Sequence, residues 1–520
     1  MTNTNYQRHK LMIAGCLFLY TLSIFLPGAY SIDSWNQWRE VTSTHFDDWY
    51  GTGLVTTWRV LWIVTGNYMC LYVAQMFVYW TFITFILWQV PFKSVIYWLT
   101  LAIALFYCMI PQYVMRDSLS VLAWGMAALL LLYGAGLYGA GSQGAGSQGA
   151  AGGEIHRRRG IIRRGTILAL LLLAYGVWVR INAIAAFLPL AYACIVLLAG
   201  GGPLEGGSRV EGGSRVEGGG RVEGGQMVGD GPLMGGSRMA GVGRMALLKR
   251  LLLTVGAAVI LMAAIPFFMY TVQKAEKQFP DYKLKLLDLS GISKLSGENC
   301  FPAEITQFPS FRLDSLFAWY TPASIDDIYW PTGHQPIFPG PNDSLDKAVS
   351  KSWAAAIRRH PGYYLQNRFA GFLYYLRIKK RFAMADYWNT APFFIYPDNP
   401  LQLKGENTKL KTRIIAAYGH FYRTPIFDPW FWLLLNCAGF GLFIHRYRRR
   451  PDKTYWMVHV CIQLSGILFL LSQSLIYQHD RDFRYNYWNV VVAFLAIPGL
   501  FALRSGQKDR GPVSSRPPDE

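Results

Sequence analysis

The sequence has few acidic residues and lacks the short motifs of many soluble enzymes. It holds 31 Asp and Glu against 50 Lys and Arg, which gives a formal net charge of +19. It contains no G-x-S-x-G, no P-loop and no H-E-x-x-H, which argues against nucleophile-elbow hydrolases, P-loop NTPases and zincins. G-x-G-x-x-G matches begin at Gly134 and Gly139, but they fall in a Gly/Ala repeat with no preceding strand, so they do not predict a dinucleotide site.

Cysteine is also scarce outside apolar segments. Only Cys300 lies in a polar region, so no intramolecular disulfide can form there, and no C-x-x-C or Cys/His spacing predicts zinc. The other six lie within apolar runs, where free cysteine behaves as a small hydrophobic residue: Cys16, Cys70, Cys108, Cys194, Cys437 and Cys461.

Long apolar runs are abundant. Hydrophobic residues make up 52% of the chain, and they cluster in runs of roughly 17–25 residues, the length of a transmembrane helix. The sequence therefore predicts a polytopic α-helical membrane protein of about ten transmembrane helices. The predicted spans are 11–27, 68–90, 94–111, 118–138, 166–180, 183–199, 251–271, 428–445, 455–477 and 488–503.

The basic residues between these runs predict the topology. With a cytoplasmic N-terminus, the basic loops fall on the cytoplasmic side, as the positive-inside rule requires; they are Lys93, 156–164, 249–250, 445–453 and the tail. A small-x-small sequence at 29–31 could mark signal-peptide cleavage after the first run. That run is long for a signal peptide and the charges fit its retention, so we predict a span. The basic excess thus indicates topology rather than nucleic-acid binding.

The predicted domain organisation has four parts. Residues 1–270 form an N-terminal transmembrane module with a catalytic first loop (28–67) and cytoplasmic Gly-rich low-complexity insertions (134–153 and 200–246), predicted to be flexible. Residues 271–427 form an extracytoplasmic domain of mixed helical and irregular structure, inserted before the last three spans. Residues 428–503 form the C-terminal transmembrane helices, and 504–520 a cytoplasmic tail.

Helices are predicted inside the extracytoplasmic domain. Asp343 or Ser344 can cap a helix with apolar residues at helical spacing. His360 and Pro361 are expected to end it, and Pro361 can begin a second helix.

Acidic residues occur at span ends on the predicted extracytoplasmic face. Asp33 follows the first span among tryptophans, where it could remove a proton from a hydroxyl group, although it could also cap a short helix beginning near Ser31. Asp117 lies between the third and fourth spans, again at a possible helix start. Together with the Asp47–Asp48 pair, these residues predict a shared acidic pocket, which could hold a divalent cation through oxygen ligands.

Arginines occur on the same face. Arg180 lies in an apolar context, where a charge is costly enough to favour a paired or functional role, with snorkelling as the alternative. Arg484 precedes the last span and could pair with Asp480 and Asp482. Converging arginines favour a lipid phosphate group, because guanidinium forks match phosphate oxygens.

These elements resemble the GT-C fold class of membrane glycosyltransferases, which includes the protein O-mannosyltransferases, the aminoarabinose transferase of lipid A and bacterial surface-polysaccharide transferases. Y-S-I-D at 30–33 and D-W at 48–49 resemble the first-loop motif of bacterial members. The later W-x-x-x-I-x-x-H-P-x-x-Y-L-x-x-R pattern is echoed across 353–368. Tyr50-Gly51 departs from the expected His-Pro, and Arg116 stands where some members have Lys or another acid.

The resemblance implies that Asp33 is the catalytic base and Asp117 the second acidic element. It implies that Arg180, Arg484 and Tyr485 hold the donor phosphate, with Arg116 and Asp48 as further substrate-binding residues. No cofactor is certain, and metal dependence stays open because of Arg116.

The function expected on this basis is inverting transfer of a sugar from a polyprenyl-phosphate donor. The acceptor would be extracytoplasmic, such as lipid A, O-antigen, another glycan or protein, and the enzyme would lie in a bacterial inner membrane with its active site on the periplasmic face. The alternatives are a transporter or flippase for lipid-linked sugars, a polymerase or ligase with a pyrophosphate donor, and a membrane scaffold.

Overall fold

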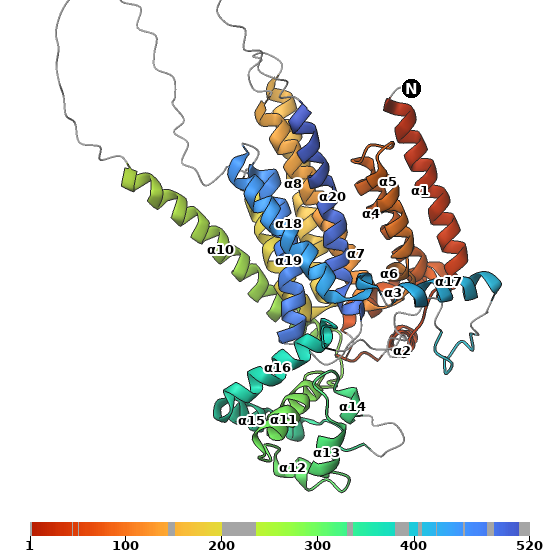
Figure 1. Cartoon of the computed structure of the whole chain (residues 1–520), viewed down its shortest axis with the longest axis vertical. Coiled ribbons are helices and arrows are strands. Elements are labelled where there is room, and N and C mark those ends of the chain that lie inside the picture. Colours follow the sequence, from red (N-terminus) through yellow and green to blue (C-terminus); the bar gives the residue numbers. More distant parts are fainter. Residues whose placement is uncertain are drawn as a thin grey trace, which may run out of the picture.

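The chain folds into a helix bundle and a smaller unit at one end of it (Figure 1). The computed structural model describes residues 3–43, 45–49, 51–143, 151–199, 236–329, 336–379, 395–403, 408–422, 424–450, 453–475 and 483–508. Within these ranges the regular structure is helical, and β-pairing is limited to three isolated bridges.

We call the long helices together the helix bundle. Its members are α1 (Asn3–Phe25), α4 (Cys70–Trp88), α5 (Val95–Phe106), α7 (Arg116–Gln143), α8 (Ala151–Val179), α9 (Ile184–Leu198), α10 (Gly236–Phe267), α18 (Pro429–Arg449), α19 (Lys453–Leu475) and α20 (Tyr487–Lys508). Helices overlap each of the ten predicted spans in the described part of the chain, although 94–111 is interrupted between α5 and the short helix at 109–112. In the described part of the chain, six stretches are long and apolar enough to cross a membrane: 70–88, 95–112, 116–137, 156–179, 245–272 and 453–472.

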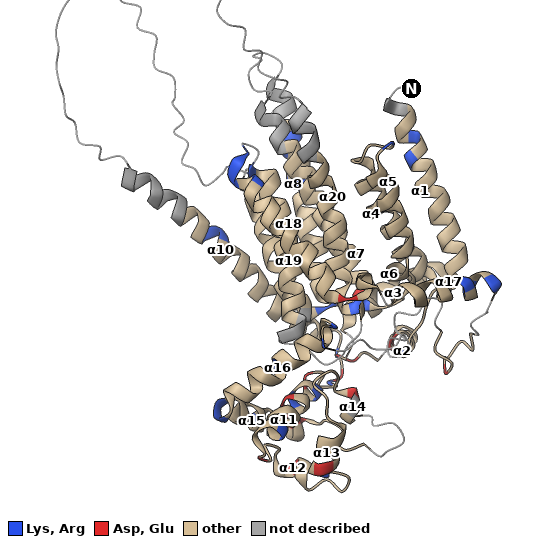
Figure 2. Ribbon diagram, viewed as in Figure 1, with Lys and Arg blue, Asp and Glu red and all other residues tan. Residues whose placement is uncertain are grey.

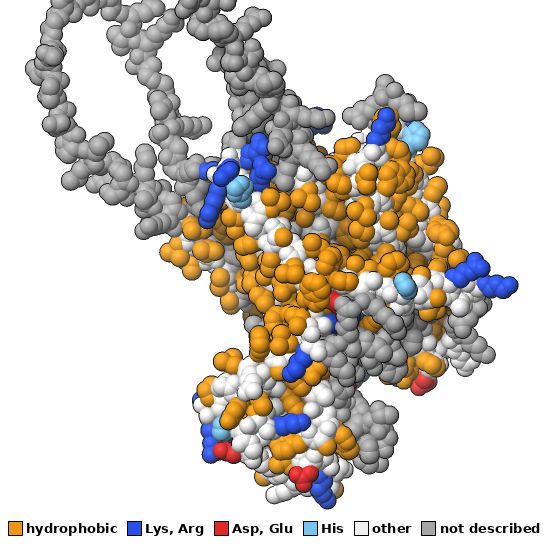
Figure 3. Space-filling model, viewed as in Figure 1, with side chains coloured by type: hydrophobic (Ala, Val, Ile, Leu, Met, Phe, Trp, Pro, Cys, Tyr) orange, Lys and Arg blue, Asp and Glu red, His pale blue; other side chains and the backbone are white. Residues whose placement is uncertain are grey.

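The face of the bundle seen in Figure 3 is largely apolar. The most apolar stretch, Met245–Val272, is only 17% buried, whereas Arg116–Leu137 in the centre is 72% buried. A helix that exposes so many large apolar side chains needs an apolar solvent, because water would penalise that surface. The chain is therefore a helical membrane protein.

Basic residues gather at the end of the bundle away from the smaller unit (Figure 2). Arg446, Arg448 and Arg449 lie in the last turn of α18, where cations interact favourably with the helix dipole. Elsewhere in the bundle, Lys10 of α1 donates hydrogen bonds to the carbonyl oxygens of Leu87 (3.1 Å), Trp88 (3.2 Å) and Val90 (2.6 Å). These carbonyls end α4, so Lys10 fixes α1 to its neighbour.

Close packing in the centre of the bundle depends on a small residue. A Cβ on Gly176 of α8 would lie 2.1 Å from Nε1 of Trp124 on α7. Trp124 is fully buried and donates a hydrogen bond to the carbonyl of Leu173 at 3.2 Å. Glycine at this position therefore permits the close approach of α7 and α8.

Shorter helices lie across the end of the bundle that faces the smaller unit (Figure 1). They are α2 (Ile32–Thr42), α3 (Thr52–Thr65), α6 (Met109–Gln112) and α17 (Lys409–Phe421), with the short turns η1 (Ile181–Ala183), η2 (Phe268–Val272), η4 (Pro425–Phe427) and η5 (Phe483–Asn486). Bridges join Ala29 to Tyr113 and Tyr30 to Ile395. The first loop is thereby tied to the start of α7 and to a distant segment of the chain.

The smaller unit, which we call the polar domain, has its own hydrophobic core. It comprises α11 (Tyr282–Ser296), α12 (Ala303–Thr306), α13 (Leu313–Trp319), α14 (Asp326–Tyr329), α15 (Asp343–Arg359) and α16 (Pro361–Tyr375). The break at His360 and Pro361 is confirmed. The cap of α15 is Asn342, whose side chain accepts a hydrogen bond from Leu345 N at 2.9 Å, so the prediction of Asp343 or Ser344 is wrong by one or two residues.

A buried ion pair crosses the polar domain. Arg368 of α16 donates to Asp288 of α11 at 2.5 Å, and Nε1 of Trp353 on α15 donates to the same oxygen at 2.8 Å. Burial raises the pKa of Asp288, while Arg368 opposes that shift. One carboxylate therefore joins three helices.

Helix α17 packs on the bundle and not in the polar domain. There the Tyr418 hydroxyl donates to the carbonyl of Phe106.

The two predicted flexible insertions differ in part from the structure. Helix α7 continues through Gln143, α8 begins at Ala151 and α10 begins at Gly236. The remaining parts, 144–150 and 200–235, lie outside the described residues.

Candidate functional site

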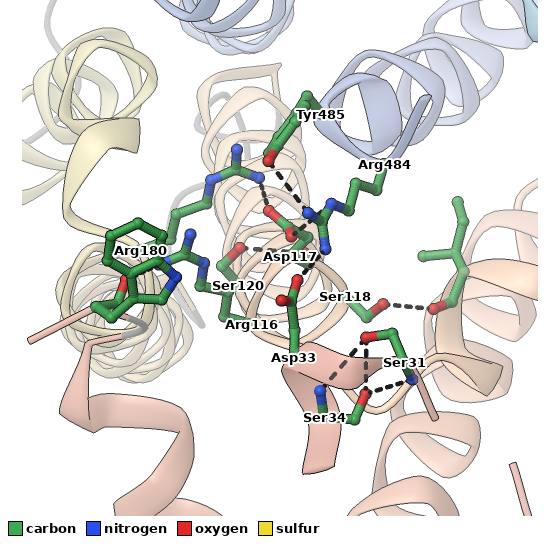
Figure 4. A network of polar contacts seen from close by, with 12 residues as sticks. Ser31, Asp33, Ser34, Arg116, Asp117, Ser118, Ser120, Arg180, Arg484 and Tyr485 are labelled. Carbon is green, nitrogen blue, oxygen red and sulfur yellow. Dashed lines mark hydrogen bonds and ion pairs between the residues drawn. The ribbon is translucent and has the colours of Figure 1, made fainter. Parts of the chain in front are cut away.

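Asp33 lies in the first turn of α2, and the structure decides its role in that helix. Ser31 is the N-cap: its Oγ accepts from Ser34 N at 3.3 Å, and Ser34 Oγ accepts from Ser31 N at 3.1 Å. This capping box satisfies the helix start. Ser31, and not Asp33, therefore caps α2. The Asp33 side chain points to other residues instead (Figure 4).

Asp117 is the second residue of α7 and is deeply buried. Its side chain is 2% exposed, as is that of Arg180, with which it forms an ion pair. Arg180 follows directly after α8, at the start of η1. The charge predicted to be costly in an apolar context is thus paired with a carboxylate, which offsets the cost of burying both groups.

Arg484 joins the two aspartates. It lies on η5, just before α20, and its Nη1 donates to Oδ2 of Asp33 at 2.6 Å. Its Nε lies 3.9 Å from Oδ2 of Asp117, and its Nη2 donates to the Tyr485 hydroxyl at 3.2 Å. The guanidinium group of Arg484 therefore contacts an acid from the first loop and an acid from the bundle (Figure 4).

The ring of Tyr485 is shared by both arginines. The guanidinium carbon of Arg180 lies 5.0 Å from the ring centroid, and that of Arg484 lies 5.1 Å from it. Cation–π attraction stabilises both guanidinium groups beside the ring of Tyr485. We call Asp33, Asp117, Arg180, Arg484 and Tyr485 the site cluster; all five were predicted from the sequence as site residues.

The two remaining predicted site residues, Arg116 and Asp48, are held by other partners, and of the two it is Arg116 that lies beside the site cluster (Figure 4). Arg116 Nη1 donates to the carbonyl of Trp49 at 3.0 Å, and its charge acts on Asp117. Asp48 accepts from the Tyr270 hydroxyl and from Gln278 N, both at 2.6 Å. These bonds join the first loop to the segment that leads into the polar domain, so the structure gives Asp48 partners other than the members of the site cluster.

The first loop also contains a strongly perturbed acid. Glu40 of α2 is buried, and one carboxylate oxygen accepts from Asp47 N at 3.2 Å. Burial and, secondly, the charge of Asp47 raise the pKa of Glu40 to about 8. The predicted pocket shared by Asp47, Asp48 and the aspartates of the site cluster is therefore divided, with Asp47 close to Glu40.

One neighbouring basic residue was not predicted. Arg377 is buried after the end of α16, donates to the carbonyl of Phe427 at 2.5 Å and lies 4.0 Å from Asp428. Its guanidinium carbon is 5.6 Å from the ring of Phe483, the residue before Arg484. In the sequence it falls in a basic run, 377–381, and no local signal distinguishes it from the lysines and arginine that follow.

The site cluster can bind an anion and accept a proton. Asp33 is its more accessible carboxylate, with 23% of the side chain exposed. Among the described residues, no group of three His, Cys, Asp or Glu side chains is arranged to hold a metal ion. Asp480 and Asp482, the alternative partners of Arg484, lie outside the described residues, and in the structure Arg484 pairs with Asp33.

Comparisons with family models, with curated proteins and with solved structures find no match to this chain. The resemblance to GT-C glycosyltransferases therefore stays a prediction, and the function must be argued from the site cluster itself.

Proposed function

We propose that this protein is an integral-membrane, inverting glycosyltransferase of the GT-C kind, with ten spans in a bacterial inner membrane. It takes a sugar from a polyprenyl-phosphate donor and transfers it to an extracytoplasmic acceptor, such as lipid A, O-antigen, another glycan or protein. The observation that carries the proposal is the contact of one guanidinium group, that of Arg484, with both a partly exposed carboxylate and a buried one.

The different exposure of the two carboxylates supports different roles. Asp33 is 23% exposed on its side chain and can reach a hydroxyl group of an acceptor, as a general base must. Asp117 is 2% exposed and is held by Arg180. Asp117 is therefore a positioning residue that orients the two arginines, rather than the group that takes the proton.

The arginines suit the leaving group. Arg180 and Arg484 both lie beside the ring of Tyr485, and Arg484 directly precedes α20 of the apolar bundle, so a lipid phosphate bound there would have its chain beside apolar helices. Guanidinium groups bind phosphate oxygens in a bidentate manner and stabilise the negative charge that develops on a departing phosphate. A phosphate at Arg484 would compete with Asp33 for Nη1, and so would release the carboxylate to act as a base.

The reaction balances with these groups. The acceptor oxygen forms a bond to the anomeric carbon while the bond from that carbon to the phosphate oxygen breaks. The acceptor proton passes to Asp33, and the polyprenyl phosphate leaves with the bonding electrons, paired with Arg180 and Arg484. A single displacement of this kind inverts the anomeric configuration.

The test is sugar transfer by purified, reconstituted protein with labelled polyprenyl-phosphate hexoses and a membrane glycan extract. We expect Asp33→Asn to lower the transfer rate by about 100-fold or more, because general bases contribute roughly 10²–10⁴. Asp314→Asn is the matched control, since Asp314 is exposed in the polar domain. Full activity of Asp33→Asn would refute the assignment of the base, and lipid movement across vesicles without transfer would favour a flippase.

A further inference from the structure

The last residue of α16 buries a hydroxyl group beside the site cluster. Tyr375 is 4% exposed, and among the described residues its hydroxyl oxygen has no hydrogen-bond partner. Burial of a hydroxyl group without a partner is unfavourable, and phenylalanine would fill the same apolar space without that cost. A tyrosine here therefore indicates that its hydroxyl group has a partner in another state of the protein.

The surroundings of Tyr375 point to the chemistry of that partner. Tyr375 packs in one cluster with Leu376, Leu470 and Tyr485, and Tyr485 is the ring shared by the two arginines of the site cluster. Arg180 and Arg377 act on Tyr375 electrostatically, as does Asp117 to a smaller extent. The hydroxyl group thus lies in a region where arginines would attract an anion.

Tyr375 is suited to donate a hydrogen bond there. Burial raises the pKa of Tyr375, so the phenol keeps its proton at neutral pH. A neutral hydroxyl group can donate to a phosphate oxygen without adding charge, and a hydrogen bond to a charged group is stronger than one to a neutral group.

We propose that Tyr375 donates a hydrogen bond to the phosphate group bound by Arg180 and Arg484, so that the polar domain completes the donor site. This inference rests on the proposed function and deepens it. Helix α16 packs against α19 of the bundle, and its Arg368 is paired with Asp288 of α11. Phosphate binding through Tyr375 therefore connects the ligand to the polar domain as well as to the bundle.

The test measures thermal unfolding of the full chain in detergent, with polyprenyl phosphate and, separately, with inorganic phosphate. Tyr375→Phe should unfold at the wild-type temperature or above when no ligand is present, because no intramolecular hydrogen bond is lost. Its affinity for the phosphate ligand should fall by about tenfold or more. The control is Tyr282→Phe, which removes the hydrogen bond to the carbonyl of Pro339 (3.2 Å) in the polar domain. It should lower the unfolding temperature and leave the affinity unchanged.

The outcomes separate the two proposals. Stabilisation of the wild type but equal affinity in Tyr375→Phe would overturn the role of Tyr375 alone, and so would destabilisation of ligand-free Tyr375→Phe to the extent seen for Tyr282→Phe. A wild type that neither phosphate compound stabilises would overturn the donor assignment and the Tyr375 proposal with it. If only polyprenyl phosphate stabilises the protein in a way that depends on Tyr375, the bound phosphate belongs to a lipid. If inorganic phosphate stabilises it equally, the site binds a free phosphate anion.

Discussion

At the scale of residues, the same chemical group has different properties in different surroundings. Asp33 and Asp117 are both aspartates bound to arginine, yet Asp33 has solvent access and Asp117 has almost none. A proton can be exchanged only at a carboxylate that substrate or water can reach. Exposure, rather than residue type, therefore distinguishes the proposed base from the residue that positions the arginines.

Glu40 provides a pH-dependent prediction. Its pKa is about 8 in the folded protein against 4.5 for the unperturbed group, so the folded state keeps a proton that the unfolded state releases. This contribution to stability is complete below about pH 4.5 and is lost as the pH rises through about 8. Unfolding temperature measured from pH 4.5 to pH 9 should fall more steeply for the wild type than for Glu40→Gln.

The linkage between proton binding and folding limits how strongly Glu40 can make stability depend on pH. The difference in free energy of unfolding between Glu40→Gln and the wild type should grow by up to about 1.4 kcal/mol per pH unit in this window. Glutamine keeps the oxygen that accepts from Asp47 N, so the comparison isolates the charge. Parallel curves for the two proteins would show that the pKa of Glu40 is the same in the folded and unfolded states, which would contradict the raised pKa.

At the scale of elements, α16 depends on a buried ion pair for its position in the polar domain. Replacement of Arg368 by Gln would leave Asp288 buried without its counter-charge, although the hydrogen bond from Trp353 would remain. Loss of one partner of a buried pair costs about 3–5 kcal/mol. We expect Arg368→Gln to make the polar domain unfold earlier on heating and to be cleaved faster by protease.

The double variant Asp288→Asn/Arg368→Gln is the control for this prediction. It removes both charges, so it should be less destabilised than Arg368→Gln alone. Equal or greater destabilisation of the double variant would mean that shape complementarity, and not the uncompensated charge, holds α16 in place.

The sequence predicted those helices and contacts that depend on residues close together in the chain. Apolar runs predicted the long helices, and Pro361 predicted the break between α15 and α16. A costly charge in an apolar run predicted that Arg180 has a partner. Asp48 and Arg377 could not be assigned in this way, because their partners Tyr270 and Asp428 come from segments whose position depends on the whole fold.

At the scale of the whole molecule, the proposed orientation is testable with cysteine labelling. The seven native cysteines are first replaced, and a single cysteine is then introduced at Asp343 or at Arg449. Asp343 is exposed in the polar domain, and Arg449 is exposed at the basic end of α18. In intact spheroplasts, a membrane-impermeant maleimide should label Asp343→Cys and spare Arg449→Cys.

Solubilised protein is the control for this experiment, because detergent should expose both cysteines equally. Labelling of Arg449→Cys with protection of Asp343→Cys would reverse the orientation and move the site cluster to the cytoplasmic face. The proposed use of an extracytoplasmic acceptor would then be contradicted.

The contact between Asp33 and Arg484 joins residues 451 positions apart in the chain. Asp33 emerges early from the ribosome, whereas Arg484 precedes the last helix, so the contact can form only when synthesis is almost complete. A prematurely terminated chain would insert its early helices and yet lack Arg484 and Tyr485. If the proposed function holds, incomplete products are therefore expected to be inert in the membrane, and activity is expected only in chains that extend through Arg484 and Tyr485.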